Sequence, residues 1–338
     1  MISGSVIFYK IASTCLIILA GYVTRRLLPD VSLNVISKYL LYLGLPCYVM
    51  YYMPTSVDAT TLTANWYFPL LGALIVAAAD IFGYAAARLW ARPGERATFR
   101  ILVALPNWMF MALAVCEPLF REDGVRVVLL YNIGITFYIW TFGMTSFRSG
   151  ATAGAMAKQL FLNPQNIAMA VGLALALTLP FLRGMEKMPS EELARLPFFM
   201  GILTPFWETI YLLGSTALPL SIFQIGLLLG SPVESGVKPP SDLRSLVLSC
   251  ALRLLAVPVL TIGVLFALTR LGLRLSFSEF MVSVIVMAMA PAVMITSVTE
   301  VYGGAGRLAA RGILWGTIAS LATAPVITWL AQNAFTLF

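Results

Sequence analysis

The chain has 338 residues, of which 60% are hydrophobic and 11% are charged, and it carries a formal net charge of +7. Its mean hydropathy is +0.89. Soluble domains contain about 25% charged residues, so this chain has too few charged side chains to cover a water-soluble globule. The composition therefore indicates an integral membrane protein rather than a soluble one.

Apolar segments follow one another along the whole chain, each near the ~20 residues that a helix needs to cross a hydrocarbon core of about 30 Å. They are much longer than the ~9–11 residues of a membrane barrel strand. The sequence therefore predicts an all-α membrane protein with ten transmembrane helices. The predicted spans are 5–25, 34–53, 66–90, 99–120, 126–147, 163–182, 204–229, 243–268, 278–301 and 310–335.

Lys and Arg residues are unevenly divided between alternate loops, one set of loops holding about twice as many as the other. Cytoplasmic loops carry the excess of positive charge, so we expect both termini to lie outside, in a bacterial inner (plasma) membrane. The basic link from Arg88 to Arg100 is then expected to contact anionic lipid. This bias accounts for the net charge without a nucleic-acid partner.

Histidine is absent from the sequence, and the four cysteines lie in or near apolar spans without metal-ligand spacing. A Ser-His-Asp triad, a histidine-ligated metal and a histidine proton relay are therefore excluded. We expect no cofactor and no metal. If the protein moves protons, then Asp, Glu or water must carry them.

The two halves of the sequence, 1–150 and 151–338, resemble each other and have five predicted spans each. Leu-rich sequence leads to a proline in the second span of each half, at Pro46 and at Pro219. Because each half has an odd number of spans, the second half must be inserted upside down relative to the first. The pattern predicts an inverted-topology repeat, which is common in secondary transporters.

Each half also has a proline in the middle of its fourth span, Pro106 in span four and Pro291 in span nine. Proline breaks a helix, and a half-helix N-terminus in the membrane can hold a carboxylate. Asn107 adds an amide, and Thr296 and Ser297 add hydroxyls. The sequence predicts an anion site at these breaks; two ordinary kinks without a ligand are the alternative.

Two charged residues lie deep in equivalent spans, Asp80 in span three and Arg253 in span eight. Counting about 1.5 Å per residue places them at similar depths. One interpretation is a structural salt bridge; the other is that Asp80 titrates during transport while Arg253 attracts an anionic substrate. Asn132 in span five either contacts substrate or holds helices together.

Several segments in order resemble the auxin efflux carrier family, which includes the plant PIN-type carriers. The resemblance covers the chain from GYVTRR near Arg25 to the region of Pro325. The matching segments are LPNWMF at Leu105–Phe110, Asn163–Pro164, ALPLSIFQIGL at Ala217–Leu227, RLLAVP at Arg253–Pro258 and MAPAVMITSVTEVYG at Met289–Gly303.

The resemblance implies a ten-helix fold shared with the bile acid–sodium symporter class, with a scaffold domain from spans 1, 2, 6 and 7 and a transport domain from spans 3–5 and 8–10. It places the substrate site at the crossed, broken helices four and nine, including Ala292 beside Pro291. It also implies organic anion substrates such as auxin, malonate or malate, an elevator-like movement, and a homodimer through the scaffold. The residues that hold sodium in the bile acid branch are missing near Pro291, which argues against sodium coupling and leaves proton coupling or no coupling ion as the alternatives to it.

Three other functions compete with a carrier. A channel would predict rings of like charge or a carbonyl filter, and the sequence has neither pattern. An aspartyl intramembrane protease needs two membrane aspartates, whereas only Asp80 lies deep in a span. A sensor with a carrier-like fold has the same sequence features as a carrier.

Overall fold

A computed structural model describes residues 4–143, 154, 161–162, 164–182, 198–230, 243–295, 298–299 and 304–336. Within these residues the regular structure is helical, apart from one isolated bridge between two extended segments. The all-α fold class is therefore confirmed. Thr296 and Ser297, both predicted site residues, lie outside the described residues.

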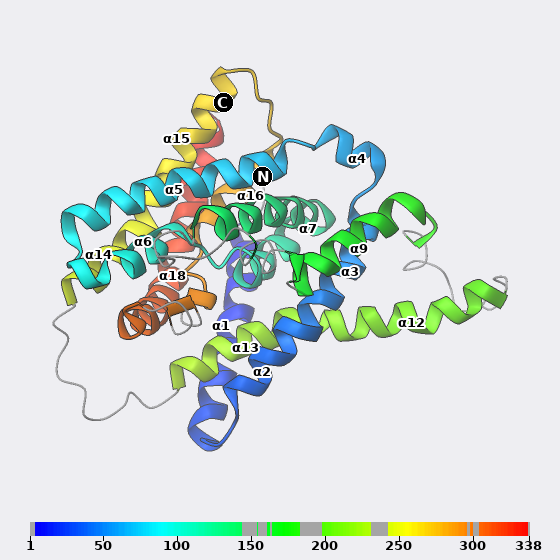
Figure 1. The fold of residues 1–338 in the computed structure, drawn as a ribbon, viewed down its shortest axis with the longest axis horizontal. Coiled ribbons are helices and arrows are strands. Elements are labelled where there is room, and N and C mark those ends of the chain that lie inside the picture. The colour runs from blue at the N-terminus through cyan, green and yellow to red at the C-terminus, as the bar shows by residue number, and fades with distance from the viewer. Residues whose placement is uncertain are drawn as a thin grey trace.

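Helices cover the described part of each predicted span (Figure 1). In the first half they are α1 (Gly4–Leu27), α2 (Leu33–Tyr39), η1 (Leu40–Gly44), α3 (Leu45–Ser56), α4 (Ala59–Ala64), α5 (Phe68–Trp90), η2 (Pro93–Glu95), α6 (Arg96–Ala104) and α7 (Phe110–Thr141). In the second half they are α9 (Pro164–Thr178), α12 (Phe198–Ser215), α13 (Ala217–Gly230), α14 (Leu243–Ala251), η4 (Leu252–Ala256), α15 (Val257–Arg270), α16 (Phe277–Ala288) and α18 (Gly306–Phe335).

Two of the predicted boundaries differ from the structure. The segment 204–229 was expected to be one helix, but α12 and α13 meet at Thr216 and α12 begins earlier, at Phe198. The second half of span four and span five appear as the single helix α7, yet Arg121 within it has a φ of 53° and a ψ of −134°. The chain reverses direction at this left-handed residue. A Cβ on Gly124 would lie 2.5 Å from the Cys116 carbonyl oxygen, whereas eight residues of straight helix span about 12 Å.

Two π-helical turns interrupt the helices, and each precedes a proline: η1 comes before Pro46 and η4 before Pro258. In both cases the proline lies two residues after the turn ends. Proline has no N–H and its ring clashes with the carbonyl four residues earlier. A wider turn accommodates both effects, and such turns often occur at functional sites.

One group of helices packs through glycine. A Cβ on Gly226 of α13 would lie 1.9 Å from the carbonyl oxygen of Ile18 in α1, and one on Gly214 of α12 would lie 2.7 Å from the backbone nitrogen of Tyr48 in α3. Small residues allow membrane helices to approach this closely. α1, α2 and α13 lie together in the lower part of the view, and α12 extends to the right (Figure 1).

The other helices, α5 to α7 and α14 to α18, surround the most deeply buried part of the molecule. Every residue from Phe280 to Ala288 in α16 is buried. By contrast, large apolar side chains are exposed on the outside of the molecule, including Ile81 at 69% and Trp329 at 62%, as lipid-facing surfaces require. Among the described residues, α5, the continuous run 243–270 and α18 are each long and apolar enough to cross a membrane.

Candidate functional site

Two unwound segments cross in the buried centre of the molecule, residues 105–109 between α6 and α7 and residues 289–293 after α16. We call these residues the crossing. Pro106 and Pro291 pair as an antiparallel bridge. The Asn107 N–H donates to the Ala290 carbonyl over 2.7 Å, and the Ala292 N–H donates to the Leu105 carbonyl over 3.0 Å.

The prolines explain why the helices stop here and why the segments pair in this register. The residue before a proline avoids the helical conformation, and Leu105 is extended with a φ of −96° and a ψ of 109°. Antiparallel pairing alternates between residue pairs that exchange hydrogen bonds and pairs that do not. Pro106 and Pro291 form a pair of the second kind, because both bonds come from their neighbours. Neither residue of such a pair uses its own N–H in the pairing, so two prolines can face each other here without the loss of a hydrogen bond.

Arg253 lies directly behind the crossing and is 0% exposed. Its Nη1 donates to the carbonyls of Val103 and Ala104, over 3.0 and 3.1 Å. Its Nε donates to the Met289 carbonyl over 3.1 Å and its Nη2 to the Met287 carbonyl over 2.5 Å. These carbonyls belong to the C-terminal ends of α6 and α16, where helical acceptors lack partners.

The predicted salt bridge between Asp80 and Arg253 is wrong. The Asp80 carboxylate accepts from Arg100, over 2.6 Å from Nε and through a second bond from Nη2, and from the Tyr138 hydroxyl over 2.8 Å. Asp80 and Arg253 were expected to pair because they lie at similar depths. Asp80 pairs instead with Arg100 of the neighbouring helix α6, whose guanidinium binds the carboxylate through two nitrogens. Arg100 was also expected to contact lipid, but its side chain is only 12% exposed.

Asn132 holds the crossing from the side of α7. Its Oδ1 accepts from the indole nitrogen of Trp108 over 2.7 Å and from the Thr136 hydroxyl over 3.1 Å. Its Nδ2 approaches the Met169 sulfur of α9 at 3.5 Å. These contacts suit the helix-packing interpretation of Asn132, and direct contact with a substrate stays a prediction.

Asn107 differs from Asn132 in having an unused side chain. It is 4% exposed, and within the described part of the chain its side-chain amide has no hydrogen-bond partner. It lies just before α7 begins at Phe110, where the first N–H groups of the helix lack helical acceptors. The crossing therefore offers an amide and a helix N-terminus, and Pro291 and Ala292 are buried opposite them.

A family model described as membrane transport protein matches residues 6–328. The chain belongs to this family. It is the auxin efflux carrier, or PIN-like, family that the sequence resembles, so the protein is a membrane protein of a transporter family. No curated protein matches the chain.

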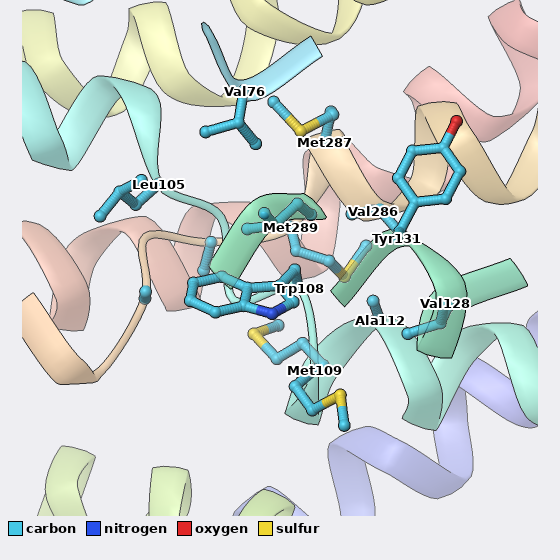
Figure 2. Close-up of a cluster of buried hydrophobic side chains, with 14 of the residues drawn as sticks. Val76, Leu105, Trp108, Met109, Ala112, Val128, Tyr131, Val286, Met287 and Met289 are labelled. Atoms are coloured by element: carbon cyan, nitrogen blue, oxygen red, sulfur yellow. The ribbon is translucent and has the colours of Figure 1, made fainter. Parts of the chain in front are cut away.

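In this membrane transport protein the crossing is surrounded by apolar side chains that sequence reasoning did not single out. Trp108 is 8% exposed and Met109 is 5% exposed. Figure 2 shows Trp108, Met109 and Met289 gathered where the two unwound segments pass. Their signal in the sequence is weak, because apolar residues in an apolar span look like ordinary core. The position of Trp108 directly after the Pro106–Asn107 break could have drawn attention to it.

The described residues of this membrane transport protein contain no group of three or more Cys, Asp or Glu side chains that could hold a metal ion. The carbonyls at the crossing accept from Arg253 and from backbone N–H groups, which leaves the Asn107 amide and the N-terminus of α7 as donors, and the Arg253 cation is buried beside them. The Asp80 carboxylate is neutralised by Arg100. Donors and a positive charge in an apolar surrounding favour the binding of an anion.

Proposed function

We propose that the protein is a secondary transporter of a small organic anion, whose carboxylate binds at the crossing. The observation that carries this proposal is the Asn107 side-chain amide, which is buried at the crossing without a partner in the described residues. The amide atoms are not fully enclosed by protein, so a ligand can reach them, and an amide N–H can donate to a carboxylate. A carboxylate between Asn107 and the N-terminus of α7 would accept from both.

The charges near the crossing support an anion rather than a cation. The positive end of the α7 dipole lies at Phe110. Arg253 adds a buried positive charge, and its guanidinium donates to carbonyl groups of the described residues. Because all of these groups lie in a buried, apolar place, their attraction for an anion is less screened than in water.

Alternating access is proposed to occur by an elevator-like movement of α5 to α7 and α14 to α18 against the remaining helices. The close pairing of α1 with α13, and of α3 with α9 and α12, supports a separate scaffold made of spans 1, 2, 6 and 7. In this arrangement spans from both halves pair in a matching way, which supports an inverted repeat. The substrate would cross with the moving helices and not through a continuous pore.

The substrate's body would lie against Trp108, Met109 and Met289. These side chains fit either an aromatic monocarboxylate or a short dicarboxylate, and coupling to protons or to no ion belongs to the same proposal. A homodimer through the scaffold and contacts with membrane lipid belong to the same proposal.

A thermal-shift screen of the purified protein tests the site. Indole-3-acetate, malonate and malate are the probes, and at least one is expected to raise the melting temperature of the wild type. Asn107→Ala should abolish that rise, whereas Asn333→Ala should retain it, because Asn333 is exposed at the far end of α18 and donates to Trp329. A rise that Asn107→Ala leaves unchanged would contradict binding at the crossing.

Proteoliposomes test whether the protein is a carrier. Saturable uptake that is accelerated by unlabelled substrate on the opposite side indicates a carrier. Ohmic conductance without such counterflow would instead support the channel.

A further inference from the structure

Arg253 has an unusual place for a charged side chain. It is 0% exposed, at the centre of a molecule whose surroundings are apolar. Burying a cation without a counter-charge is costly, and a membrane makes the cost larger. The polar groups that its guanidinium contacts are the carbonyls of Val103, Ala104, Met287 and Met289. A residue kept under these conditions is expected to have a specific task.

The four carbonyls come from the two halves of the chain. Val103 and Ala104 end α6 in the first half, whereas Met287 and Met289 lie at the end of α16 in the second half. A helix C-terminus carries a partial negative charge and unpaired carbonyls. One guanidinium therefore caps two helices that the sequence places far apart, and two negative dipole ends stabilise its charge in place of a carboxylate.

The side chain that makes this contact comes from a third helical segment, the π-helical turn η4. The wide turn ahead of Pro258 places Arg253 between the C-terminal ends of α6 and α16. The planar guanidinium of Arg253 therefore joins η4 to both helices. Lysine could not replace this group, because its single ammonium lacks the fork of donors that reaches separated acceptors.

We propose that Arg253 is the positioning residue of the crossing, tying the ends of α6 and α16 so that the two broken spans keep their register and move as one body. The backbone hydrogen bonds that directly join the two unwound segments are donated by the Asn107 and Ala292 amides. The four bonds from Arg253 reinforce them from behind. The meaning of this tie for transport rests on the proposed function, but the tie itself can be tested without any substrate.

Hydrogen exchange measured by mass spectrometry on the purified protein is the test. In Arg253→Lys the amides of peptides covering 101–112 and 287–295 are expected to exchange about tenfold faster or more, since the loss of even one or two net hydrogen bonds corresponds to such a factor. Exchange in α1 and α13 should stay unchanged. Arg270→Lys is the matched control, because Arg270 is an exposed residue of α15 that lies over the Phe266 ring.

Unchanged exchange at both peptides in Arg253→Lys would overturn the proposal, as would equal acceleration throughout the molecule, which would mean a general loss of stability. If Arg253→Lys yields no folded protein, a covalent tie replaces the arginine. Facing residues of a non-hydrogen-bonded pair lie about 4.5 Å apart, within the range of a disulfide. Pro106→Cys with Pro291→Cys, in a chain whose four native cysteines are replaced by alanine, should then restore folded Arg253→Lys under oxidising conditions; no recovery would overturn the proposal.

Discussion

The helices around the crossing and the helices of the α1–α13 and α3–α12 pairs both pack closely through glycine, but buried charged side chains add bonds around the crossing. Around the crossing, buried polar groups join the helices: Asp80 with Arg100 and Tyr138, and Arg253 with four carbonyls. In the other region glycines let backbones touch, as at Gly226 and Gly214. Buried polar bonds have strict geometry, whereas glycine contacts depend on shape alone. Glycine contacts also occur around the crossing, where a Cβ on Gly134 of α7 would lie 1.7 Å from the Pro69 carbonyl oxygen of α5. The region with the proposed site therefore adds directional bonds to close packing.

The largest effect is expected at the charge pair. Asp80→Asn leaves the Arg100 cation buried without its partner, which should lower the free energy of unfolding by about 3–5 kcal/mol. Denaturation of the purified protein, followed by tryptophan fluorescence, measures it. The double variant Asp80→Asn with Arg100→Gln should be less destabilised than the single one. A stable Asp80→Asn protein whose uptake loses its pH dependence would instead support titration of Asp80 during transport.

Close packing gives the next effect. Gly226→Ala places a methyl group within 1.9 Å of the Ile18 carbonyl in α1, and such overpacking should cost about 1–3 kcal/mol. Gly263→Ala in α15 is the matched control, because nothing lies within 4 Å of its new methyl group and alanine favours a helix. Equal melting temperatures of the two variants would remove the distinction between the two regions.

Asn132 tests the support of the crossing. Asn132→Ala removes the acceptor of the Trp108 indole and should cost about 1–3 kcal/mol. Asn132→Asp keeps an acceptor oxygen and should retain the Trp108 contact, which indole fluorescence can report. If both variants keep wild-type stability and bind the acid identified in the thermal-shift screen with unchanged affinity, Asn132 neither supports the crossing nor contacts substrate.

The smallest effect on stability is expected where the two regions meet. The Tyr48 hydroxyl of α3 donates to Glu117 of α7 over 3.3 Å. Tyr48→Phe should change the free energy of unfolding by no more than about 1 kcal/mol. An elevator movement would have to break this contact, so the counterflow rate in proteoliposomes should change several-fold. Tyr211→Phe, a ring that packs on Tyr51, is the control, and equal rates in all three proteins would place the moving boundary elsewhere.

The helical content and the breaks at Pro106 and Pro291 could be predicted because they depend on local properties, the length of apolar segments and the missing N–H of proline. The partners of Asp80 and Arg253 could not. Counting residues along a helix gives depth but not the direction in which a side chain points, and no pattern of side chains shows that Arg253 binds backbone carbonyls. Arg100 looked like a loop residue because it belongs to a basic run. The bridge register of the crossing also depends on tertiary contacts that single segments do not contain.

The facing prolines have a consequence for the carrier when it is empty. A segment interrupted by any other residue could close into a continuous helix once its ligand left, and the next ligand would have to open it again. Pro106 and Pro291 lack the N–H that a continuous helix would use whether or not a ligand is bound, so closing the break is unfavourable in the empty protein as well. In the proposed carrier, the unloaded protein would return across the membrane with the site still unwound, and little binding energy would be spent on opening it.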